Sequence, residues 1–565
     1  MTEVRDYREE YKRWLEQANE GLQAELRGYD EAQIEDSFYR NLAFGTGGLR
    51  GVIGAGTNRM NIHTVAKASQ GLAAYLRQQY GQEASVAIGY DSRLKSDEFA
   101  RVAASVFAAN GVKVFIWNRL LPVPTVSYAV RYLGTSAGVM ITASHNPSQY
   151  NGYKVYGADG CQITTEAAKE ILASIEVVDI FDGVQTTSFE AALDDRKISY
   201  IEDKVFDSFL QAVKDQSVLY GEDIDKNVSI VYSPLNGTGL EPVTRILKEE
   251  GYTNITLVEE QRQPDGNFPT CPYPNPEIKE ALALGIEYCQ KIGADLMLAT
   301  DPDCDRVGIA VKNNDGDYQL LTGNEVGLLL LDYICSQRTK HDTMPEKPLL
   351  IKTIVTIDMA DRIAADYGME TINVLTGFKF IGEQIGILES NDEEDRYVFG
   401  FEESYGYLTG GYVRDKDGVD GAYIVCEMFS YYKTHGVSLL DKLNELYAKY
   451  GYCLNTLHSY KFDGSAGMAK MQAIMTHVRE NVAAGDAFAG RKVLQVEDYS
   501  QGLNGLPKSN VLKIKLENNI SVVVRPSGTE PKLKLYLSVS GDSRQIAEEA
   551  EREIAAACGD MIAAV

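Results

Sequence analysis

Short apolar segments with strand character alternate with helical segments along most of this chain. We expect strands at 85–91, 112–117 and 137–142, then at 228–233, 255–258 and 294–299, and again at 349–355 and 397–399. A helix over 98–110 separates the first two strands, and comparable segments separate the others. Strands that alternate with helices over short connections are typical of parallel sheets covered by helices. The sequence therefore predicts three α/β domains in series.

The last part of the chain has a different pattern. Residues 511–516 and 532–539 alternate apolar with polar side chains, and a helix is expected over 544–557. Such alternation is typical of an antiparallel sheet with one covered face. A chain of 565 residues is also too long for a single core. We expect three α/β domains with parallel or mixed sheets over 1–203, 204–320 and 321–450, and a smaller α+β domain over 451–565.

We predict the local structure of two segments near the N-terminus. Residues 7–27 are rich in Glu, Lys, Arg, Leu and Ala, and we interpret them as one exposed amphipathic helix. Residues 44–51 are dense in glycine, and we expect a loop there.

The charge of the chain restricts its partners. The formal net charge is -26, and nucleic acids and anionic membranes are bound largely through basic surface, so we expect neither as a partner. No apolar run approaches the roughly 20 residues that span a bilayer, and the first residues do not resemble a secretory leader. The eight cysteines are scattered without a Cys-x-x-Cys pair, which favours neither disulfides nor zinc. We therefore expect a cytoplasmic protein.

The segment Thr142-Ala143-Ser144-His145-Asn146-Pro147 follows an apolar strand. Loops held by a rigid scaffold are where catalytic groups concentrate. A serine hydroxyl such as that of Ser144 is a weak nucleophile unless a base, a metal or a lowered pKa activates it. Ser144 is therefore a candidate catalytic residue, and its neighbour His145 is either a participant or a structural histidine.

A second polar loop, Asp301-Pro302-Asp303-Cys304-Asp305-Arg306, also follows an apolar strand. Carboxylates at alternate positions project to one side of an extended segment, and their mutual repulsion is relieved by a hard cation. An all-oxygen site suits Mg²⁺. A lone pattern of this kind is more often a solvated acidic turn, but its place after a strand and before Arg306 favours the metal.

Two further loops contain groups that suit a sugar phosphate. The segment Gly400-Phe401-Glu402-Glu403-Ser404 offers carboxylates and a hydroxyl for a polyol, or is an ordinary polar turn. The segment Arg525-Pro526-Ser527-Gly528-Thr529 offers a guanidinium, hydroxyls and a glycine for a phosphate, with Lys534 nearby, or is a tight exposed turn. Arg50 and Lys154 add cations near the first loop, although either alone is more often a surface charge.

Taken together and in this order, the four loops resemble those of the alpha-D-phosphohexomutase superfamily, over essentially the whole chain. The Glu-Glu-Ser segment, Thr376-Gly377-Phe378-Lys379 and the proline-rich stretch from 269 to 276 resemble the long bacterial phosphoglucomutases of the phosphoglucomutase/phosphomannomutase family most. The resemblance implies four domains around a central active-site cleft. Cys304 departs from the family, which usually has glycine or alanine there.

The resemblance also implies residue roles. Ser144 is the phosphorylated serine, and Asp301, Asp303 and Asp305 bind Mg²⁺ together with a phosphate oxygen on Ser144. Arg50, His145, Lys154 and Lys416 are implied around the reacting groups. The residues implied to bind substrate are Arg306, Gly377, Lys379, Glu402, Ser404, Arg525, Ser527, Gly528, Thr529 and Lys534.

The activity implied by the resemblance is that of an isomerase, an intramolecular phosphotransferase that interconverts glucose 1-phosphate and glucose 6-phosphate. Glucose 1,6-bisphosphate is then the intermediate and activator. Phosphomannomutase, phosphopentomutase and sugar-bisphosphate synthase activities stay open as alternatives, as does a sugar-phosphate-binding protein without catalysis. The sequence does not distinguish a monomer from a dimer.

Overall fold

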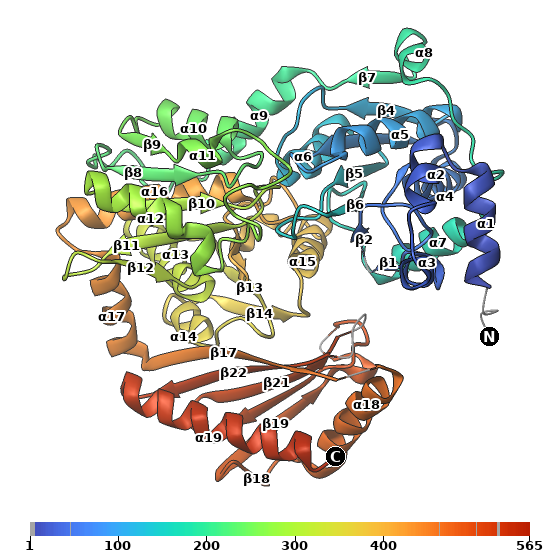
Figure 1. The fold of residues 1–565 in the computed structure, drawn as a ribbon. Coiled ribbons are helices and arrows are strands. Elements are labelled where there is room, and N and C mark those ends of the chain that lie inside the picture. The colour runs from blue at the N-terminus through green and yellow to red at the C-terminus, as the bar shows by residue number, and fades with distance from the viewer. Residues whose placement is uncertain (1–5, 46, 463, 504, 528–531) are drawn as a thin grey trace. The chain divides into compact units, whose positions relative to one another are not determined.

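Internal contacts divide the chain into two units. Unit 1 comprises Met1–Leu320, Gly382–Glu394 and Gly406–Ser430, and unit 2 comprises Leu321–Ile381, Asp395–Tyr405 and Tyr431–Val565. The computed structural model describes residues 6–45, 47–462, 464–503, 505–527 and 532–565 (Figure 1). Two pieces of the expected third domain thus belong to unit 1, and the four domain boundaries stay predictions.

The first sheet of unit 1 has the strand order β1-β2-β6-β5-β3-β4-β7. Its strands are β1 (Phe44–Gly45), β2 (Gly48–Val52), β3 (Ser85–Tyr90), β4 (Lys113–Ile116), β5 (Ala137–Ile141), β6 (Tyr150–Gly157) and β7 (Ile198–Tyr200). Strands β5, β3, β4 and β7 are parallel, whereas β6 and the β1–β2 hairpin are antiparallel to their neighbours. The sheet is therefore mixed, and the loops at the carboxyl ends of its parallel strands lie at one edge of the sheet.

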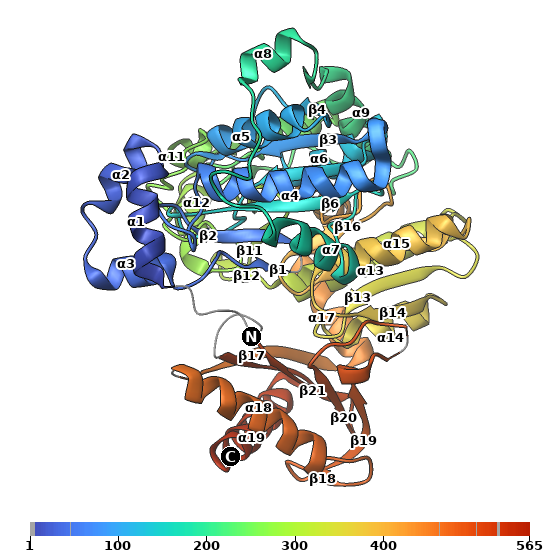
Figure 2. The same cartoon turned by 90° about the vertical axis from the view of Figure 1, so that its right-hand side faces the viewer.

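Helices cover both faces of this sheet. Alternate residues of β5 face opposite ways: Val139 packs in the core formed with α4, α5 and α7, and Met140 packs against α6. Helices α4 and α5 lie side by side (Figure 2). The helices of this region are α4 (Ile62–Tyr80), α5 (Ser96–Ala109), α6 (Val123–Leu133), α7 (Thr165–Glu176), α8 (Phe189–Asp194) and α9 (Asp203–Lys214).

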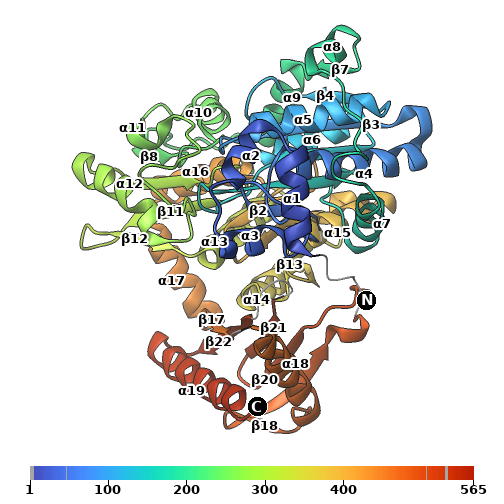
Figure 3. The ribbon, with the colours of Figure 1, turned by 45° about the vertical axis from the view of Figure 1, so that its right-hand side comes forward.

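The N-terminal segment forms three helices, α1 (Tyr7–Gln17), α2 (Glu20–Leu26) and α3 (Glu31–Phe38), which pack together (Figure 3). The single exposed helix expected over 7–27 is therefore wrong. Its Asn19 adopts an extended backbone, and its side chain accepts a hydrogen bond from the N–H of Leu22, which starts a new helix. The side chain of Trp14 is fully buried, because α1 has an apolar face against α3.

The loop expected over 44–51 is also wrong, because most of it forms the β1–β2 hairpin. Gly48 has a φ of 144°, and a Cβ there would lie 1.8 Å from the carbonyl oxygen of Tyr153 on β6. The glycines thus permit a close approach between β2 and β6 rather than a flexible loop.

The second sheet of unit 1 has the order β12-β11-β10-β8-β9, with β10, β8 and β9 parallel and β11 antiparallel to β10. Its elements are β8 (Ile230–Ser233), α10 (Leu240–Glu249), β9 (Ile255–Leu257), α11 (Glu259–Arg262), α12 (Lys279–Ile292), β10 (Leu296–Thr300), β11 (Val307–Lys312) and β12 (Tyr318–Leu321). Strand β16 (Gly406–Leu408) belongs to unit 1 as well, and the unit boundary falls within α15 (Phe378–Ser390) and α16 (Gly418–Thr434).

Unit 2 contains three parallel strands in the order β14-β13-β15. The elements of this part are α13 (Gly323–Lys340), β13 (Leu349–Thr353), α14 (Met359–Asp366), β14 (Glu370–Val374), β15 (Tyr397–Glu402) and α17 (Leu439–Tyr450). Short 3₁₀ helices occur at Gly81–Glu83, Glu394–Arg396 and Tyr499–Gln501 in the two units.

The C-terminal part of unit 2 is an antiparallel sheet in the order β17-β22-β21-β20-β19-β18. Its elements are β17 (Tyr452–Lys461), α18 (Gly464–Asn481), β18 (Ala487–Phe488), β19 (Arg491–Asp498), β20 (Leu512–Leu516), β21 (Ile520–Pro526), β22 (Lys532–Gly541) and α19 (Arg544–Ala563). Both α18 and α19 pack on one face of the sheet, through every second residue of β20, β21 and β22 (Figure 1). The predicted fold class, α/β followed by α+β, is confirmed.

In the part of the chain that the structure describes, no helix combines the length and the apolar character that crossing a membrane requires.

Candidate active site

Ser144 lies in the loop that follows β5, and its backbone has a left-handed φ of 54°. The N–H of Ser144 donates to Thr142 Oγ1 at 2.8 Å, so the strand end itself shapes the loop. The side-chain Oγ of Ser144 donates to Asp301 Oδ2 at 3.2 Å and lies 3.1 Å from His145 Nδ1. The residue is 3% exposed. The hydroxyl is thus held against the aspartate loop of the second sheet.

Arg93 holds the same loop through its backbone carbonyls. The Arg93 guanidinium donates to the carbonyl oxygen of Ser144 at 2.6 Å, to that of Pro147 at 2.9 Å and also to that of Asn146. It is buried, and its charge is paired with Asp91 at 3.5 Å. A planar fork of donors matches several acceptors at once, so Arg93 fixes the backbone from Ser144 onward.

Asp301, Asp303 and Asp305 converge after β10, and each offers one carboxylate oxygen that lies within 4.8 Å of the other two. All three side chains are buried. Burial, and then the neighbouring Asp303 and Asp305 charges, raise the pKa of Asp301 well above its ordinary value. One oxygen each of Asp303 and Asp305, Oδ1, is buried without a hydrogen-bond partner among the described residues. Three buried carboxylates, two of them with an unused oxygen, fit a divalent cation with oxygen ligands.

Two lysines reach the aspartates from different segments. Lys154 on β6 places Nζ 3.0 Å from Asp303 Oδ2 and 3.2 Å from Asp305 Oδ2. Lys416, between β16 and α16, places its Nζ 3.2 Å from the same Asp305 oxygen. Burial would lower the pKa of Lys154, but Asp303 and Asp305 outweigh it and raise that pKa. In the same way, burial would raise the pKa of Asp305, but Lys416, Lys154 and Arg306 outweigh it and lower that pKa.

Arg306 and His145 complete this cluster. The Nε of Arg306 lies 3.9 Å from Asp301 Oδ2 and 3.8 Å from Asp305 Oδ1, and its Nη1 pairs with Glu277. Burial, then the charges of Arg306 and Arg50, lower the pKa of His145 to about 2. The imidazole is therefore held in its neutral form.

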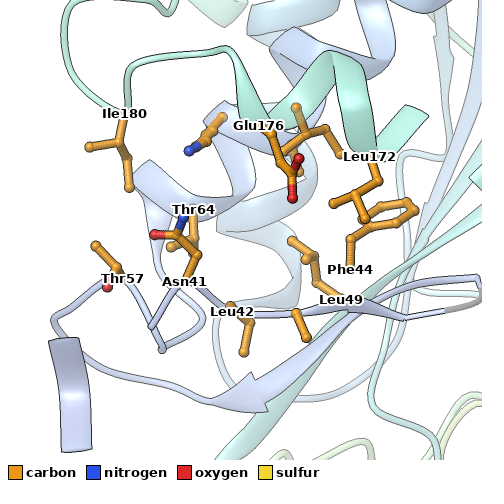
Figure 4. A pocket seen from close by; sticks show the side chains of 13 residues that line it. Asn41, Leu42, Phe44, Leu49, Thr57, Thr64, Leu172, Glu176 and Ile180 are labelled. Atoms are coloured by element: carbon orange, nitrogen blue, oxygen red, sulfur yellow. The ribbon is translucent and has the colours of Figure 1, made fainter. Parts of the chain in front are cut away.

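Arg50 on β2 contacts the serine loop, whereas its neighbour Leu49 faces away from it. The Arg50 Nη1 donates to Asn146 Oδ1 at 3.1 Å. Leu49 and Phe44 line a pocket of about 250 Å³ on the other face of the strand (Figure 4). Successive side chains of a strand point to opposite faces, so this pocket is separate from the Ser144 cluster.

The aspartate loop is supported by close backbone contacts. Thr238 donates to the carbonyl oxygen of Pro302 through its N–H at 2.9 Å and its hydroxyl at 3.0 Å. A Cβ on Gly237 would lie 2.4 Å from Pro302 Cα. Cys304 has a left-handed φ of 51°, and its thiol sulphur packs beside Gly239 and Gly418. Burial, then nearby carboxylates, raise the pKa of the Cys304 thiol, which is therefore not a reactive thiolate.

The expected sugar loop lies in unit 2. Glu402 is the last residue of β15 and is buried, and Ser404 follows in the turn. Lys379 in the first turn of α15 is also buried, and Gly377 just before the helix has a φ of 117° that favours glycine. The structure therefore places these residues at the carboxyl end of β15 and the start of α15.

The expected phosphate loop also lies in unit 2. Arg525 on β21 and Lys534 on β22 are directly opposite each other in the sheet. Like charges in this position destabilise a sheet unless an anion lies near them. The N–H of Ser527 donates to the carbonyl oxygen of Lys532 at 2.7 Å. Gly528 and Thr529 lie outside the described residues.

Several residues that shape the cluster were not among those expected from the sequence, namely Asp91, Arg93, Thr142 and Glu277. Asp91 and Arg93 follow β3, which is parallel to β5 and next to it. Parallel strands end at the same edge of a sheet, so charged residues directly after β3 were a signal for this site.

Comparisons with known proteins agree with this geometry. Family models match four successive ranges: phosphoglucomutase/phosphomannomutase alpha/beta/alpha domain I at 41–179, domain II at 207–316, domain III at 322–450 and the C-terminal domain at 476–556. Together they cover most of the chain in the expected order.

Similar proteins include the phosphoglucomutase of Staphylococcus saprophyticus, which is 36% identical over 541 residues, 93% of this chain and 96% of the relative. The phosphoglucomutase of Staphylococcus haemolyticus is 34% identical over 545 residues, 94% of this chain and 96% of the relative. Parafusin, a phosphoglucomutase of Paramecium in an open form, has a similar fold, with a TM-score of 0.71 at 16% identity over 93% of this chain and 95% of that one. The serine and aspartate loops lie within ranges that the four family models match, and a relative is 36% identical over 93% of the chain. The chain therefore belongs to the phosphoglucomutase/phosphomannomutase family.

Proposed function

We propose that the chain is a phosphoglucomutase that interconverts glucose 1-phosphate and glucose 6-phosphate. The reaction passes through a phosphorylated Ser144 and glucose 1,6-bisphosphate. The observation that carries the proposal is the position of Ser144 Oγ, 3.2 Å from Asp301 Oδ2, in a cluster that also holds two lysines. Relatives at 36% identity over nearly the whole chain bear the same name, which supports the sugar assignment.

The cation is proposed to be Mg²⁺, bound by Asp301, Asp303, Asp305 and a phosphate oxygen on Ser144. The unused buried oxygens of Asp303 and Asp305 support this assignment, because all-oxygen sites favour hard cations. A bound Mg²⁺ would neutralise negative charge on the transferred phosphoryl group.

The protein groups position the reactants and balance charge. Lys154 carries a proton at physiological pH, since its pKa is raised, and together with Lys416 it offers positive charge beside the phosphoryl group. Arg93 keeps the backbone around Ser144 in place. His145 presents a neutral ring to the serine oxygen. Arg50 and Arg306 supply further positive charge for the substrate.

The residues of unit 2 are proposed to bind the remainder of the substrate. Glu402 accepts hydrogen bonds from sugar hydroxyls, and the Ser404 hydroxyl donates to or accepts from them, with Gly377 and Lys379 as further contacts. The residues proposed to hold the phosphate that does not react are Arg525, Ser527, Gly528, Thr529 and Lys534. The opposed cations Arg525 and Lys534 support this role.

The proposed compartment is the cytoplasm. All eight cysteines are buried and none forms a disulfide, as expected where thiols stay reduced. The proposed ligands are sugar phosphates and glucose 1,6-bisphosphate, all of them small anions.

Intact-mass spectrometry tests the phosphoserine directly. The chain is incubated with glucose 1,6-bisphosphate and Mg²⁺, and one phosphate adduct is expected. The adduct should disappear in Ser144→Ala and persist in Ser148→Ala, a control in the same loop. An unmodified wild-type chain that also lacks turnover would contradict the proposed function.

Turnover of competing substrates tests the sugar. We expect faster conversion of glucose 1-phosphate than of mannose 1-phosphate or ribose 1-phosphate, with the bisphosphate retained. A preference for ribose 1-phosphate would identify a phosphopentomutase instead. Net release of bisphosphate in the presence of an outside phosphoryl donor would identify a sugar-bisphosphate synthase.

A further inference from the structure

The segment 411–417 carries Lys416 to the aspartate group, yet it is almost free of regular structure. It runs between β16 and α16, and a single bridge joins its Arg414 to Cys161 among the residues that the structure describes. A lysine side chain is long and flexible, so its ammonium stays at Asp305 only if the backbone beneath it is held. What holds this backbone therefore decides where the Lys416 charge lies.

Arg414 is two residues before Lys416 and is 1% exposed. Its guanidinium folds back on its own loop, where Nη1 donates to the carbonyl oxygens of Gly411 and, at 3.3 Å, of Val413. The Nη2 reaches Glu389 Oε2 at 2.8 Å. One side chain thus ties the loop to itself and to α15.

Glu389 is shared between two arginines. Arg131 on α6 donates to Glu389 Oε1 at 2.7 Å, and also to the carbonyl oxygen of Asp159 at 3.1 Å. The hydrogen bond from Arg131 outweighs partial burial and, with Arg414, lowers the pKa of Glu389 to about 2. The carboxylate is therefore charged throughout the physiological range and joins the loop to α6.

The backbone of Arg414 is held as well. Its N–H donates to Ser127 Oγ at 2.9 Å, and that hydroxyl donates to the carbonyl oxygen of Gly160 at 2.7 Å. A Cβ on Gly382 would lie 2.1 Å from the Arg414 carbonyl oxygen, so α15 touches the loop directly.

The next residues extend this attachment to the aspartate loop. Asp415 accepts a hydrogen bond from the hydroxyl of Tyr156 at 2.9 Å. The N–H of Gly418 donates to the carbonyl oxygen of Cys304 at 3.0 Å. Lys416 lies between these two attachments, with its Nζ 3.2 Å from Asp305 Oδ2.

We propose that Arg414 is a positioning residue, which with Glu389 and Arg131 fixes the 411–418 segment and so holds the Lys416 ammonium at the reacting phosphoryl group. This inference rests on the proposed function. The hydrogen bonds of the Arg414 guanidinium go to its own loop and to Glu389, rather than to the aspartates or Ser144, so Arg414 acts through Lys416.

Arg414→Lys keeps a positive charge but removes the fork that binds Gly411 and Glu389 together. We expect kcat to fall roughly 10- to 100-fold, because a displacement of about 1 Å near the reacting group costs that much. KM should change far less. Glu389→Gln, at a half-exposed position that tolerates change, should lower kcat by a smaller factor and keeps the test open if Arg414→Lys folds poorly.

Arg396→Lys is the matched control. Arg396 binds a carboxylate, that of Glu370 at 2.9 Å, and a backbone carbonyl, that of Lys347 at 3.0 Å, but it lies in unit 2. Its replacement should leave kcat and KM unchanged. A loss equal to that of Arg414→Lys would show that any change to a paired arginine lowers activity, and would overturn the inference.

A double-mutant cycle separates positioning from a general structural role. Arg414→Lys is introduced into Lys416→Ala, and we expect no further loss of kcat beyond about twofold. A full additional loss would mean that Arg414 acts by another route, and would overturn the inference.

Hydrogen exchange provides a readout without turnover. Backbone amides of 411–418 should exchange faster in Arg414→Lys and Glu389→Gln than in the wild type, and at the wild-type rate in Arg396→Lys. If the wild type is active and Arg414→Lys shows unchanged kcat and unchanged exchange, this inference is overturned while the proposed function stands. A wild type without mutase turnover would overturn the proposed function, and exchange would then decide whether Arg414 holds the segment.

Discussion

At the scale of single residues, the site depends on side chains that hold backbone in conformations a loop would not keep by itself. Ser144 and Cys304 both have left-handed φ angles, of 54° and 51°. For residues with a Cβ, such angles carry strain of about 1 kcal/mol or more. Arg93 opposes that strain at Ser144 through several carbonyl oxygens, and Thr238 supports the loop of Cys304 through Pro302.

Arg93→Lys tests how far the serine loop depends on this arginine. The lysine keeps the charge opposite Asp91 but cannot reach the carbonyl oxygens of Ser144, Asn146 and Pro147 together. We expect kcat to fall about 100-fold, measured by a coupled assay for glucose 6-phosphate.

Arg77→Lys is the control for this variant, because Arg77 on α4 also donates to a backbone carbonyl, that of Gly81 at 2.5 Å, outside the serine loop. It should keep the wild-type kcat. Wild-type kcat in Arg93→Lys would contradict the positioning role of Arg93.

Asp303→Asn tests the cation site. With Mg²⁺ at about 100 times its Kd, the wild type should gain about 2.7 kcal/mol, and the variant should gain almost nothing. Differential scanning fluorimetry with EDTA or Mg²⁺ measures both effects.

The matched variant for this experiment is Asp295→Asn, a change in a carboxylate just before β10 that lies outside the aspartate group. It should keep the full stabilisation by Mg²⁺. Equal stabilisation of Asp303→Asn and the wild type would exclude Asp303 as a ligand.

At the scale of elements, the start of α16 carries two buried carboxylates. Burial, and then Asp417, raise the pKa of Asp420 to about 8, while burial raises the pKa of Asp417 to about 6. The hydroxyl of Thr409 donates to Asp420 at 2.6 Å, and that of Tyr412 donates to Asp417 at 2.8 Å. These hydrogen bonds offset only part of the cost of burial.

This arrangement predicts a pH dependence of stability. Between about pH 4 and pH 8 the folded chain keeps a proton on Asp420 that the unfolded chain has released. Stability therefore falls as pH rises through this range, by up to about 1.4 kcal/mol per pH unit from this group. Asp420→Asn should flatten the pH profile of the melting temperature between about pH 5.5 and 7.5.

Asp441→Asn is the control for this prediction, because Asp441 lies exposed in the first turn of α17. Its profile should follow the wild type. A wild-type slope in Asp420→Asn would mean that another group is responsible for the pH dependence.

At the scale of the whole molecule, unit 2 joins an α/β part to the C-terminal sheet through buried charges. Asp358, just before α14, accepts from Lys513 Nζ at 2.7 Å and from the hydroxyl of Ser521. Lys352 on β13 is fully buried and lies 3.7 Å from the same carboxylate. Burial would raise the pKa of Asp358, but Lys513 and Lys352 outweigh it and lower that pKa below its ordinary value.

Asp358→Asn should therefore destabilise unit 2. The change leaves the buried Lys513 ammonium without its carboxylate, whereas Lys352 keeps Asp361 at 3.3 Å, and breaking a buried pair costs about 3–5 kcal/mol. Differential scanning calorimetry should show the transition of unit 2 at a lower temperature, and limited proteolysis should cut unit 2 sooner. Asp366→Asn, in an exposed pair with Lys449, should leave both unchanged. Equal melting of Asp358→Asn and the wild type would contradict the role of this cluster.

Much of the fold follows from local patterns. The strands expected at 85–91, 137–142 and 294–299 are observed within two residues, because short apolar runs between polar turns leave little choice of structure. The expectations at 7–27 and 44–51 failed for opposite reasons. Asn19 starts a new helix through its own side chain, whereas the glycines at 44–51 are shaped by contact with β6, which is distant in sequence.

The sequence by itself determined the fold class, the serine and aspartate loops and the family, because strand periodicity and loop composition are local properties of the chain. Only the tertiary structure decided that Ser144 meets Asp301, that Lys154 and Lys416 share Asp305, and that Arg93 and Arg414 hold the loops. The physical reason is that the site joins residues far apart in the chain, 157 positions for Ser144 and Asp301 and 287 for Ser127 and Arg414. Such contacts form only when distant elements have packed together.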